Sequence, residues 1–153
     1  ANAFKPAHDG RCDSAWLWDS ALWVTFEAKS EEGPSQPVPL RDVRQANTHL
    51  RQLAADQGVD AVPAGSYSVI VSQRATVDPD AVAAANPNLY LASPDDVSAL
   101  AADTREAWRT LLATAAGTSA GGLRSQVTQV LADLACLPTQ VSERLTGPPI
   151  ASM

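Results

Sequence analysis

The stretch Ala21-Leu22-Trp23-Val24-Thr25-Phe26-Glu27-Ala28-Lys29 decides how this 153-residue chain is interpreted. Its aromatic and β-branched residues predict a strand that ends with an acid and a lysine two positions apart. Because side chains alternate between the two faces of a strand, Glu27 and Lys29 should project to the same side and share one pocket. The alternative is a solvated Glu–Lys pair on the outer face of an edge strand.

A second aromatic-rich run, Ser14-Ala15-Trp16-Leu17-Trp18, lies just upstream. The turn-forming pair Asp19-Ser20 between the two runs predicts a β-hairpin. Asp13 lies opposite Glu27 in such a hairpin only if the loop has an odd number of residues, such as residues 19–21. With that register Asp13, Glu27 and Lys29 converge on one end of the hairpin, as a metal site requires.

These residues, with the helix that opens Arg44-Gln45-Ala46-Asn47-Thr48-His49, resemble the PD-(D/E)XK nuclease superfamily over residues 9–115. The resemblance implies that Asp13 and Glu27 bind Mg²⁺ or Mn²⁺, with the backbone carbonyl of Ala28 completing the metal site. It also implies that Lys29 orients or activates the attacking water.

The helix after the motif strand adds a further candidate. Several members of the superfamily place a Gln beside the site, and Gln45 is the position that looks similar. Gln45 with His49 resembles a Gln-x-x-x-Tyr variant in which His replaces the aromatic residue. On a helical wheel, however, His49 sits about 100° from the centre of the apolar stripe and Gln45 farther round.

The resemblance implies an α/β fold, with a restriction-endonuclease-like mixed central sheet flanked by helices. We expect this core over residues 1–116, and a Gly-rich hinge with a helical C-terminal extension over residues 117–153. The pattern departs from the superfamily in two ways. Cys12 replaces the proline that names the motif, and the twelve residues before Asp13 are too few for the helix and strand that begin the superfamily core. We therefore expect a longer parent protein to supply them.

Hydrophobic periodicity and turn residues predict the other elements of the chain. An amphipathic helix is expected over residues 41–57, after a loop over residues 30–39 at the mouth of the site. Its buried stripe is Val43, Ala46, Leu50, Leu53 and Ala54. Strands are expected at residues 66–72 and 88–92, with helices over residues 79–85, from Pro94, over 123–136 and over 138–145.

Composition limits the functions that fit. The net charge of −6 argues against DNA binding by bulk electrostatics, although Arg41, Arg44 and Arg51 cluster on one side of the expected helix and are candidate DNA contacts. The alternative is a solvated helix face.

The absence of a long apolar stretch and of a leader predicts a soluble, cytoplasmic protein without membrane contact. Cys12 and Cys136 are expected to be buried free thiols.

We therefore expect a Mg-dependent endonuclease domain that hydrolyses phosphodiester bonds in DNA, in a restriction, phage-defence or repair system. Its expected partners are DNA and the remainder of a longer parent chain or a partner subunit, and a homodimer is compatible with this interpretation. One alternative is a catalytically inactive nuclease-like module that contacts or positions DNA within a larger assembly. Another is an unrelated α/β domain that binds a small molecule.

Overall fold

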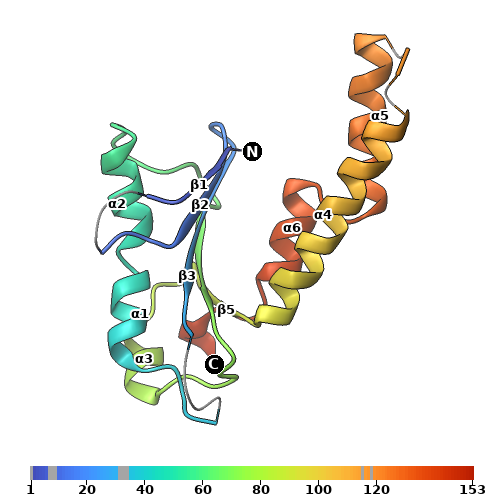
Figure 1. Cartoon of the computed structure of the whole chain (residues 1–153). Coiled ribbons are helices and arrows are strands. Elements are labelled where there is room, and N and C mark those ends of the chain that lie inside the picture. The colour runs from blue at the N-terminus through green and yellow to red at the C-terminus, as the bar shows by residue number, and fades with distance from the viewer. Residues whose placement is uncertain (1, 7–9, 31–34, 115, 118) are drawn as a thin grey trace. The chain divides into compact units, whose positions relative to one another are not determined.

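A five-stranded mixed sheet forms the centre of the first of two units in this chain (Figure 1). The structure is a computed structural model, and it describes residues 2–6, 10–30, 35–114, 116–117 and 119–153. The first unit comprises residues 1–94 and 145–153, and the second comprises residues 95–144. The α/β class expected from the sequence is confirmed.

The strands follow one another across the sheet in chain order. They are β1 (Asn2–Phe4), β2 (Ser14–Trp18), β3 (Leu22–Ala28), β4 (Tyr67–Val71) and β5 (Leu89–Ala92). The first three are antiparallel, whereas β3, β4 and β5 are parallel. The apolar strands β3 and β4 lie inside the sheet, where both of their faces can be buried.

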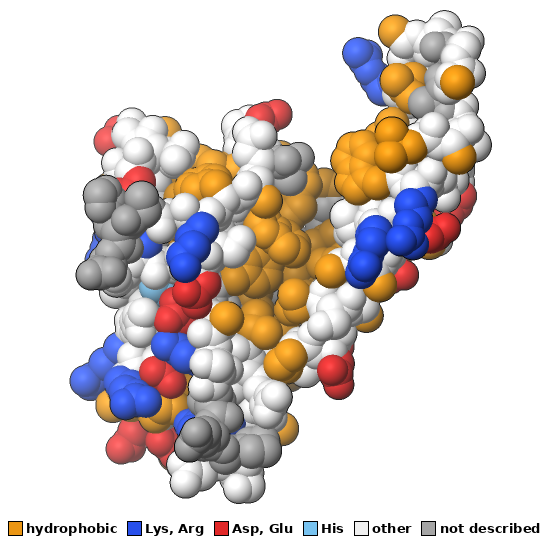
Figure 2. Space-filling view, viewed as in Figure 1, with side chains coloured by type: hydrophobic (Ala, Val, Ile, Leu, Met, Phe, Trp, Pro, Cys, Tyr) orange, Lys and Arg blue, Asp and Glu red, His pale blue; other side chains and the backbone are white. Residues whose placement is uncertain are grey.

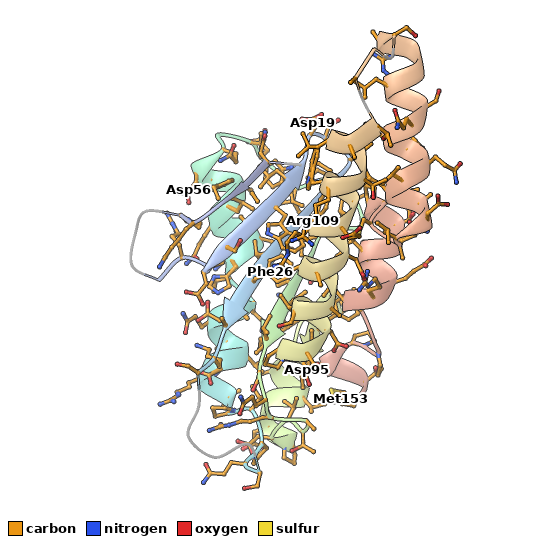
Figure 3. The ribbon with its side chains drawn as sticks, turned by 45° about the vertical axis from the view of Figure 1, so that its right-hand side comes forward. Asp19, Phe26, Asp56, Asp95, Arg109 and Met153 are labelled. Carbon is orange, nitrogen blue, oxygen red and sulfur yellow. The ribbon has the colours of Figure 1, made fainter. Side chains whose placement is uncertain are left out.

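The β2–β3 hairpin takes the register that places Asp13 opposite Glu27. Ser14 pairs with Phe26 and Trp18 with Leu22, so the loop consists of residues 19–21. Asp19, labelled in Figure 3, takes a positive φ of 48° in this tight connection. The Asp13 N–H donates to the Phe26 carbonyl at 2.8 Å, which continues the ladder toward Glu27.

The short strand β1 lies in the segment before Asp13. Residues 1–12 were expected to be too few for a helix and a strand together, and Asn2–Phe4 of this segment pairs antiparallel with β2, with Ala3 opposite Trp16. A strand needs only a few residues at about 3.3 Å each, so this short segment suffices.

Helices α1 (Leu40–Ala46), α2 (His49–Asp56) and α3 (Pro79–Ala84) lie along one face of the sheet (Figure 1). A single helix over residues 41–57 was expected, and this was wrong, because the helix breaks after Ala46. Asn47 donates its side chain to the Ala84 carbonyl and accepts from the Asn86 N–H, while the Thr48 hydroxyl donates to the Gln45 carbonyl. Such side-chain hydrogen bonds compete with the regular helical ladder and bend it. Residues 31–34 of the loop before α1 lie outside the described residues.

The helical face of the sheet is held by two apolar clusters. One joins the hairpin to α2, and the other joins β4, β5, α1 and α3 to Ile150 of the short 3₁₀ helix Ile150–Ser152. The predicted buried stripe is confirmed, since all five of its residues are buried: Val43, Ala46, Leu50, Leu53 and Ala54. On the opposite face the rings of Trp16 and Phe26 pack at a tilt of 49°, with centroids 4.4 Å apart.

The second unit is helical. It consists of α4 (Pro94–Thr114), α5 (Ala120–Asp133) and α6 (Pro138–Leu145), whose ends reach the unit boundaries. Within it Arg144 pairs with Asp103 at 2.8 Å. Cys136 is only partly buried, which corrects the expectation of a buried thiol, whereas Cys12 is buried. Among the described residues, no helix combines the length and apolarity that a membrane span requires.

Candidate functional site

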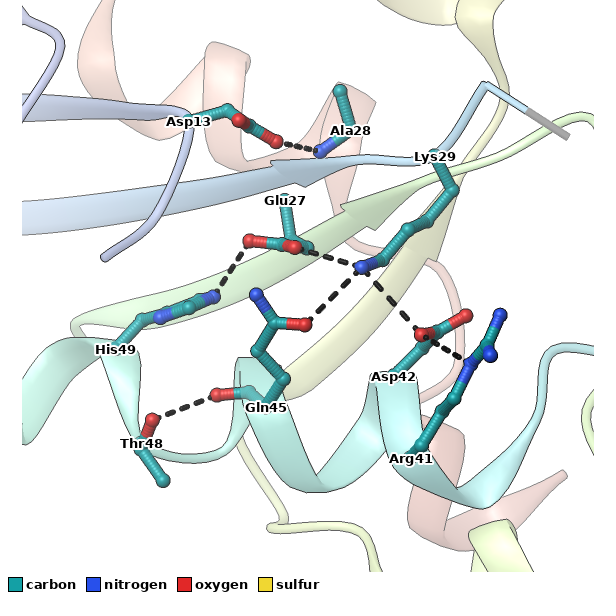
Figure 4. Close-up of polar contacts among 9 residues, drawn as sticks. All are labelled: Asp13, Glu27, Ala28, Lys29, Arg41, Asp42, Gln45, Thr48 and His49. Carbon is teal, nitrogen blue, oxygen red and sulfur yellow. Dashed lines mark hydrogen bonds and ion pairs between the residues drawn. The ribbon is translucent and has the colours of Figure 1, made fainter. Parts of the chain in front are cut away.

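Glu27 and Lys29 meet at the carboxyl end of β3, as the strand period predicts (Figure 4). Lys29 Nζ lies 2.7 Å from Glu27 Oε1. Glu27 is only 4% exposed, and β3 is flanked by β2 and β4 rather than lying at an edge. The alternative of a solvated pair on an edge strand is therefore wrong.

The Lys29 ammonium also reaches α1, which crosses beneath the end of β3. Nζ lies 3.3 Å from Gln45 Oε1 and 3.5 Å from Asp42 Oδ1. The structure thus brings Gln45 to the predicted lysine, although the helical wheel had placed it away from the buried stripe. The long lysine side chain spans the remaining gap. Asp42 was missed, and the signal that could have found it is its position one helical turn before Gln45 on the same side of α1.

His49 holds the other oxygen of Glu27. Its Nε2 lies 2.8 Å from Glu27 Oε2, and the His49 side chain is fully buried. His49 is the first residue of α2, so the break after Ala46 places it against the strand. Within the described part of the chain, His49 Nδ1 has no hydrogen-bond partner.

Asp13 contacts the backbone at the end of β3. It is exposed, and its Oδ2 accepts a 2.8 Å hydrogen bond from the Ala28 N–H. Figure 4 shows its carboxylate turned toward that backbone group and away from the Lys29 ammonium. Across the ranges that the structure describes, no three His, Cys, Asp or Glu side chains gather closely enough to hold a metal ion.

The network keeps both members of its central pair charged. Burial by itself raises the pKa of Glu27, but hydrogen bonds from His49 and Lys29 outweigh it, and the pKa falls below its ordinary value of 4.5. Burial by itself lowers the pKa of Lys29, but the hydrogen bond and charge of Glu27, with the charge of Asp42, leave that pKa above 10.5. The site therefore offers an ammonium that stays protonated at neutral pH.

The three candidate DNA-binding arginines are exposed, and one of them, Arg41, contacts the network. Arg41 is 85% exposed, with its Nε 3.4 Å from Asp42 Oδ1, and Arg44 and Arg51 are exposed. In the region of Figure 2 where Figure 1 places α1, basic and acidic side chains stand close together. A contact of these arginines with nucleic acid stays a prediction.

Comparisons with known proteins identify no relative of this chain. No protein-family model, no curated protein and no solved structure matches it.

Proposed function

We propose that this chain is a nuclease domain that hydrolyses phosphodiester bonds in DNA, with the buried Glu27–Lys29 pair and Gln45 at its site. The observation that carries the proposal is the convergence of two predicted residues, Glu27 and Gln45, on the ammonium of a third, Lys29. Lys29 Nζ lies within hydrogen-bonding distance of both Glu27 Oε1 and Gln45 Oε1, from two different elements. A β3–helix–β4 crossover supplies that geometry, in keeping with the resemblance to the PD-(D/E)XK superfamily.

The raised pKa of Lys29 defines what this residue can do. A lysine that stays protonated is a poor general base, so its contribution is a positioned positive charge. Such a charge stabilises the oxygen that becomes more negative as a phosphodiester is attacked, and it can orient the attacking water as a hydrogen-bond donor. Gln45 and Glu27 hold the ammonium in place for that role.

The expected Mg²⁺ or Mn²⁺ does not fit the side chains as they are arranged. Each carboxylate oxygen of Glu27 already receives a nitrogen donor, and Oδ2 of Asp13 accepts from a backbone N–H. A cation shared by Asp13 and Glu27 requires Lys29 or His49 to release its oxygen. Binding of the ion therefore stays a prediction.

A specific observation favours the second candidate, a catalytically inactive module that contacts or positions DNA. Each carboxylate oxygen of Glu27 already has a partner, in His49 or Lys29. A purely structural ion-pair network would show the same arrangement, and such networks also perturb pKa values.

Removing the charge of Lys29 distinguishes the nuclease from the inactive module. DNA cleavage in the presence of Mg²⁺ or Mn²⁺ should be measured for the natural full-length polypeptide that carries these residues. Lys29→Met, which keeps length but removes charge, should lower kcat by about a hundredfold or more. Lys5→Met, at the chain's other lysine, is the matched control and should leave cleavage unchanged. Cleavage that survives both Lys29→Met and Glu27→Ala would refute the proposal.

A further inference from the structure

We infer that a pocket between α2 and the amino ends of β4 and β5 binds a pyrimidine nucleotide whose base carries an amino group. The pocket has a volume of about 220 Å³, and all of its lining residues belong to the first unit. Pockets that enclose a drug-sized ligand measure roughly 300–1,000 Å³, so this smaller one suits a single flat ring. The inference goes beyond the proposed cleavage, because it involves neither Lys29 nor a metal ion.

The apolar lining of the pocket comes from both apolar clusters of the helical face. Leu50 belongs to the cluster that joins the hairpin to α2, and Leu89 to the cluster around β4 and β5. Both are buried, and Val62 packs against the first cluster and completes the lining. Aliphatic side chains cover the faces of a ring without needing hydrogen bonds. They fit a nucleobase and leave its polar edge to other groups.

The polar wall of the pocket offers hydrogen-bond acceptors. Asn88 Nδ2 donates to the Ser66 carbonyl at 3.1 Å, and Asn86 Nδ2 donates to the Asn47 carbonyl at 3.3 Å. Because a carbonyl can only accept, each carboxamide must turn its NH₂ group to the protein and keep its oxygen for another partner. Within the described residues, no donor reaches Asn86 Oδ1 or Asn88 Oδ1. A ligand at this wall must therefore donate hydrogen bonds.

Asn47 holds this wall in place. Its Nδ2 donates to the Ala84 carbonyl at 2.8 Å, and its Oδ1 accepts from the Asn86 N–H at 3.0 Å. Both polar groups of the Asn47 carboxamide are thus used within the protein. Asn47 lies at the break between α1 and α2 that also brings His49 to Glu27. These contacts order the wall before a ligand arrives, which lowers the entropic cost of binding.

Arg51 supplies the positive charge of the pocket. It lines the pocket from α2 and is exposed, and it has no ion-pair partner in the part of the chain that the structure describes. A guanidinium binds phosphate oxygens through paired N–H donors. The exocyclic amino group of cytosine is a hydrogen-bond donor, whereas thymine has a carbonyl oxygen at the same place. Acceptors, aliphatic walls and one arginine therefore select a cytosine-like nucleotide.

Binding of deoxycytidine monophosphate (dCMP) to the full chain tests the inference. Deoxyuridine monophosphate (dUMP) is the matched ligand, because a carbonyl oxygen replaces the amino group of dCMP. An NMR titration without divalent cations should show saturable shifts of the Asn86 and Asn88 side-chain amides. We expect a Kd for dCMP of about a millimolar or tighter. The Kd for dUMP should be higher by about tenfold or more, because its oxygen would face the oxygens of the wall.

Substitutions separate the contact with the phosphate from the contact with the base. Arg51→Met should weaken dCMP binding by about tenfold and leave binding of the uncharged nucleoside deoxycytidine unchanged. Arg124→Met is the matched control, because it removes an exposed arginine that does not line the pocket, and dCMP binding should not change. Asn86→Ala, at an exposed loop position, should reduce the preference for dCMP over dUMP.

Three outcomes overturn the inference, and the wild type alone reveals each of them. They are no saturable binding of dCMP up to about 10 mM, equal affinities for dCMP and dUMP, and inorganic phosphate that competes as well as dCMP does. Displacement of dCMP by a duplex with one unpaired dC would identify a nucleotide of DNA as the source, and no displacement a free nucleotide. The pocket stands in either case. Absent DNA cleavage would refute the proposed function and leave dCMP binding intact.

Discussion

His49 Nε2 lies 2.8 Å from Glu27 Oε2, and the two residues are 22 positions apart in the sequence. Each is almost completely buried, so water does not compete for the contact. The pair joins the first turn of α2 to the end of β3. It therefore fixes the rotamer of Glu27 and leaves the other oxygen of the carboxylate for Lys29.

The first prediction concerns stability. His49→Leu leaves a buried carboxylate oxygen without its donor, and it should lower the free energy of unfolding by about 3 kcal/mol. Urea denaturation measures the change. Arg11→Ala is the control, because it removes a partly exposed pair with Asp56 and should cost less than about 1 kcal/mol. Equal decreases in the free energy of unfolding for the two variants would show that the His49–Glu27 contact stabilises the fold no more than a partly exposed ion pair does.

The second prediction is a pH window for stability. The pKa of Glu27 is lower in the folded protein than its ordinary value of 4.5, so its contribution is present above 4.5 and is lost as pH falls through the folded value. The pKa of Lys29 is raised above 10.5, so its contribution is present below 10.5 and is lost as pH rises through the folded value.

The melting temperature measured against pH tests this window. Glu27→Gln should weaken the decline of the wild type on the acid side, because its side chain no longer titrates. It should also weaken the decline on the alkaline side, because Lys29 loses its closest carboxylate. Acid and alkaline limbs identical to those of the wild type would contradict the assignment of both shifts to this pair.

The third prediction concerns divalent cations. Any ion that uses Glu27 Oε1 must compete with the Lys29 ammonium, so wild-type binding of Mn²⁺ should be weak, with a Kd of about a millimolar or somewhat below. Lys29→Met should bind the ion more tightly, because it frees that oxygen and removes a like charge. Isothermal calorimetry on folded protein provides the measurement. Glu27→Ala should bind none, and heats unchanged by either substitution would place the ion elsewhere.

The fourth prediction concerns the two thiols. Burial, with the charges of Glu27 and Asp13 as lesser causes, raises the pKa of Cys12 from 9.0 to about 11. At pH 8 the thiolate fraction of Cys12 should then be lower by about a hundredfold, and its reaction with a disulfide reagent correspondingly slower. Cys136 is only partly buried and should react first. The variant Cys12→Ser assigns the phases, and loss of the fast phase in that variant would contradict the prediction.

Much of the site's framework could be predicted from local sequence. The alternation of β3 placed Glu27 and Lys29 on one face, and the Asp19-Ser20 pair between two aromatic runs predicted the hairpin, whose register the structure then showed. The partners of these residues could not be predicted in the same way. Asp42 looked like an ordinary acid in the first turn of a helix, and His49 looked peripheral to a helical stripe that was assumed to be unbroken.

The sequence by itself therefore determined the hairpin, the buried stripe of the following helices and the meeting of Glu27 with Lys29, because these depend on side-chain periodicity over a few residues. Only the tertiary structure decided what surrounds that pair. The break after Ala46 and the packing of α1 and α2 under β3 brought Asp42, Gln45 and His49 to the same two side chains, and turned Asp13 to the Ala28 N–H. Such contacts join residues far apart in the chain, and they depend on how whole elements pack, which local patterns do not encode.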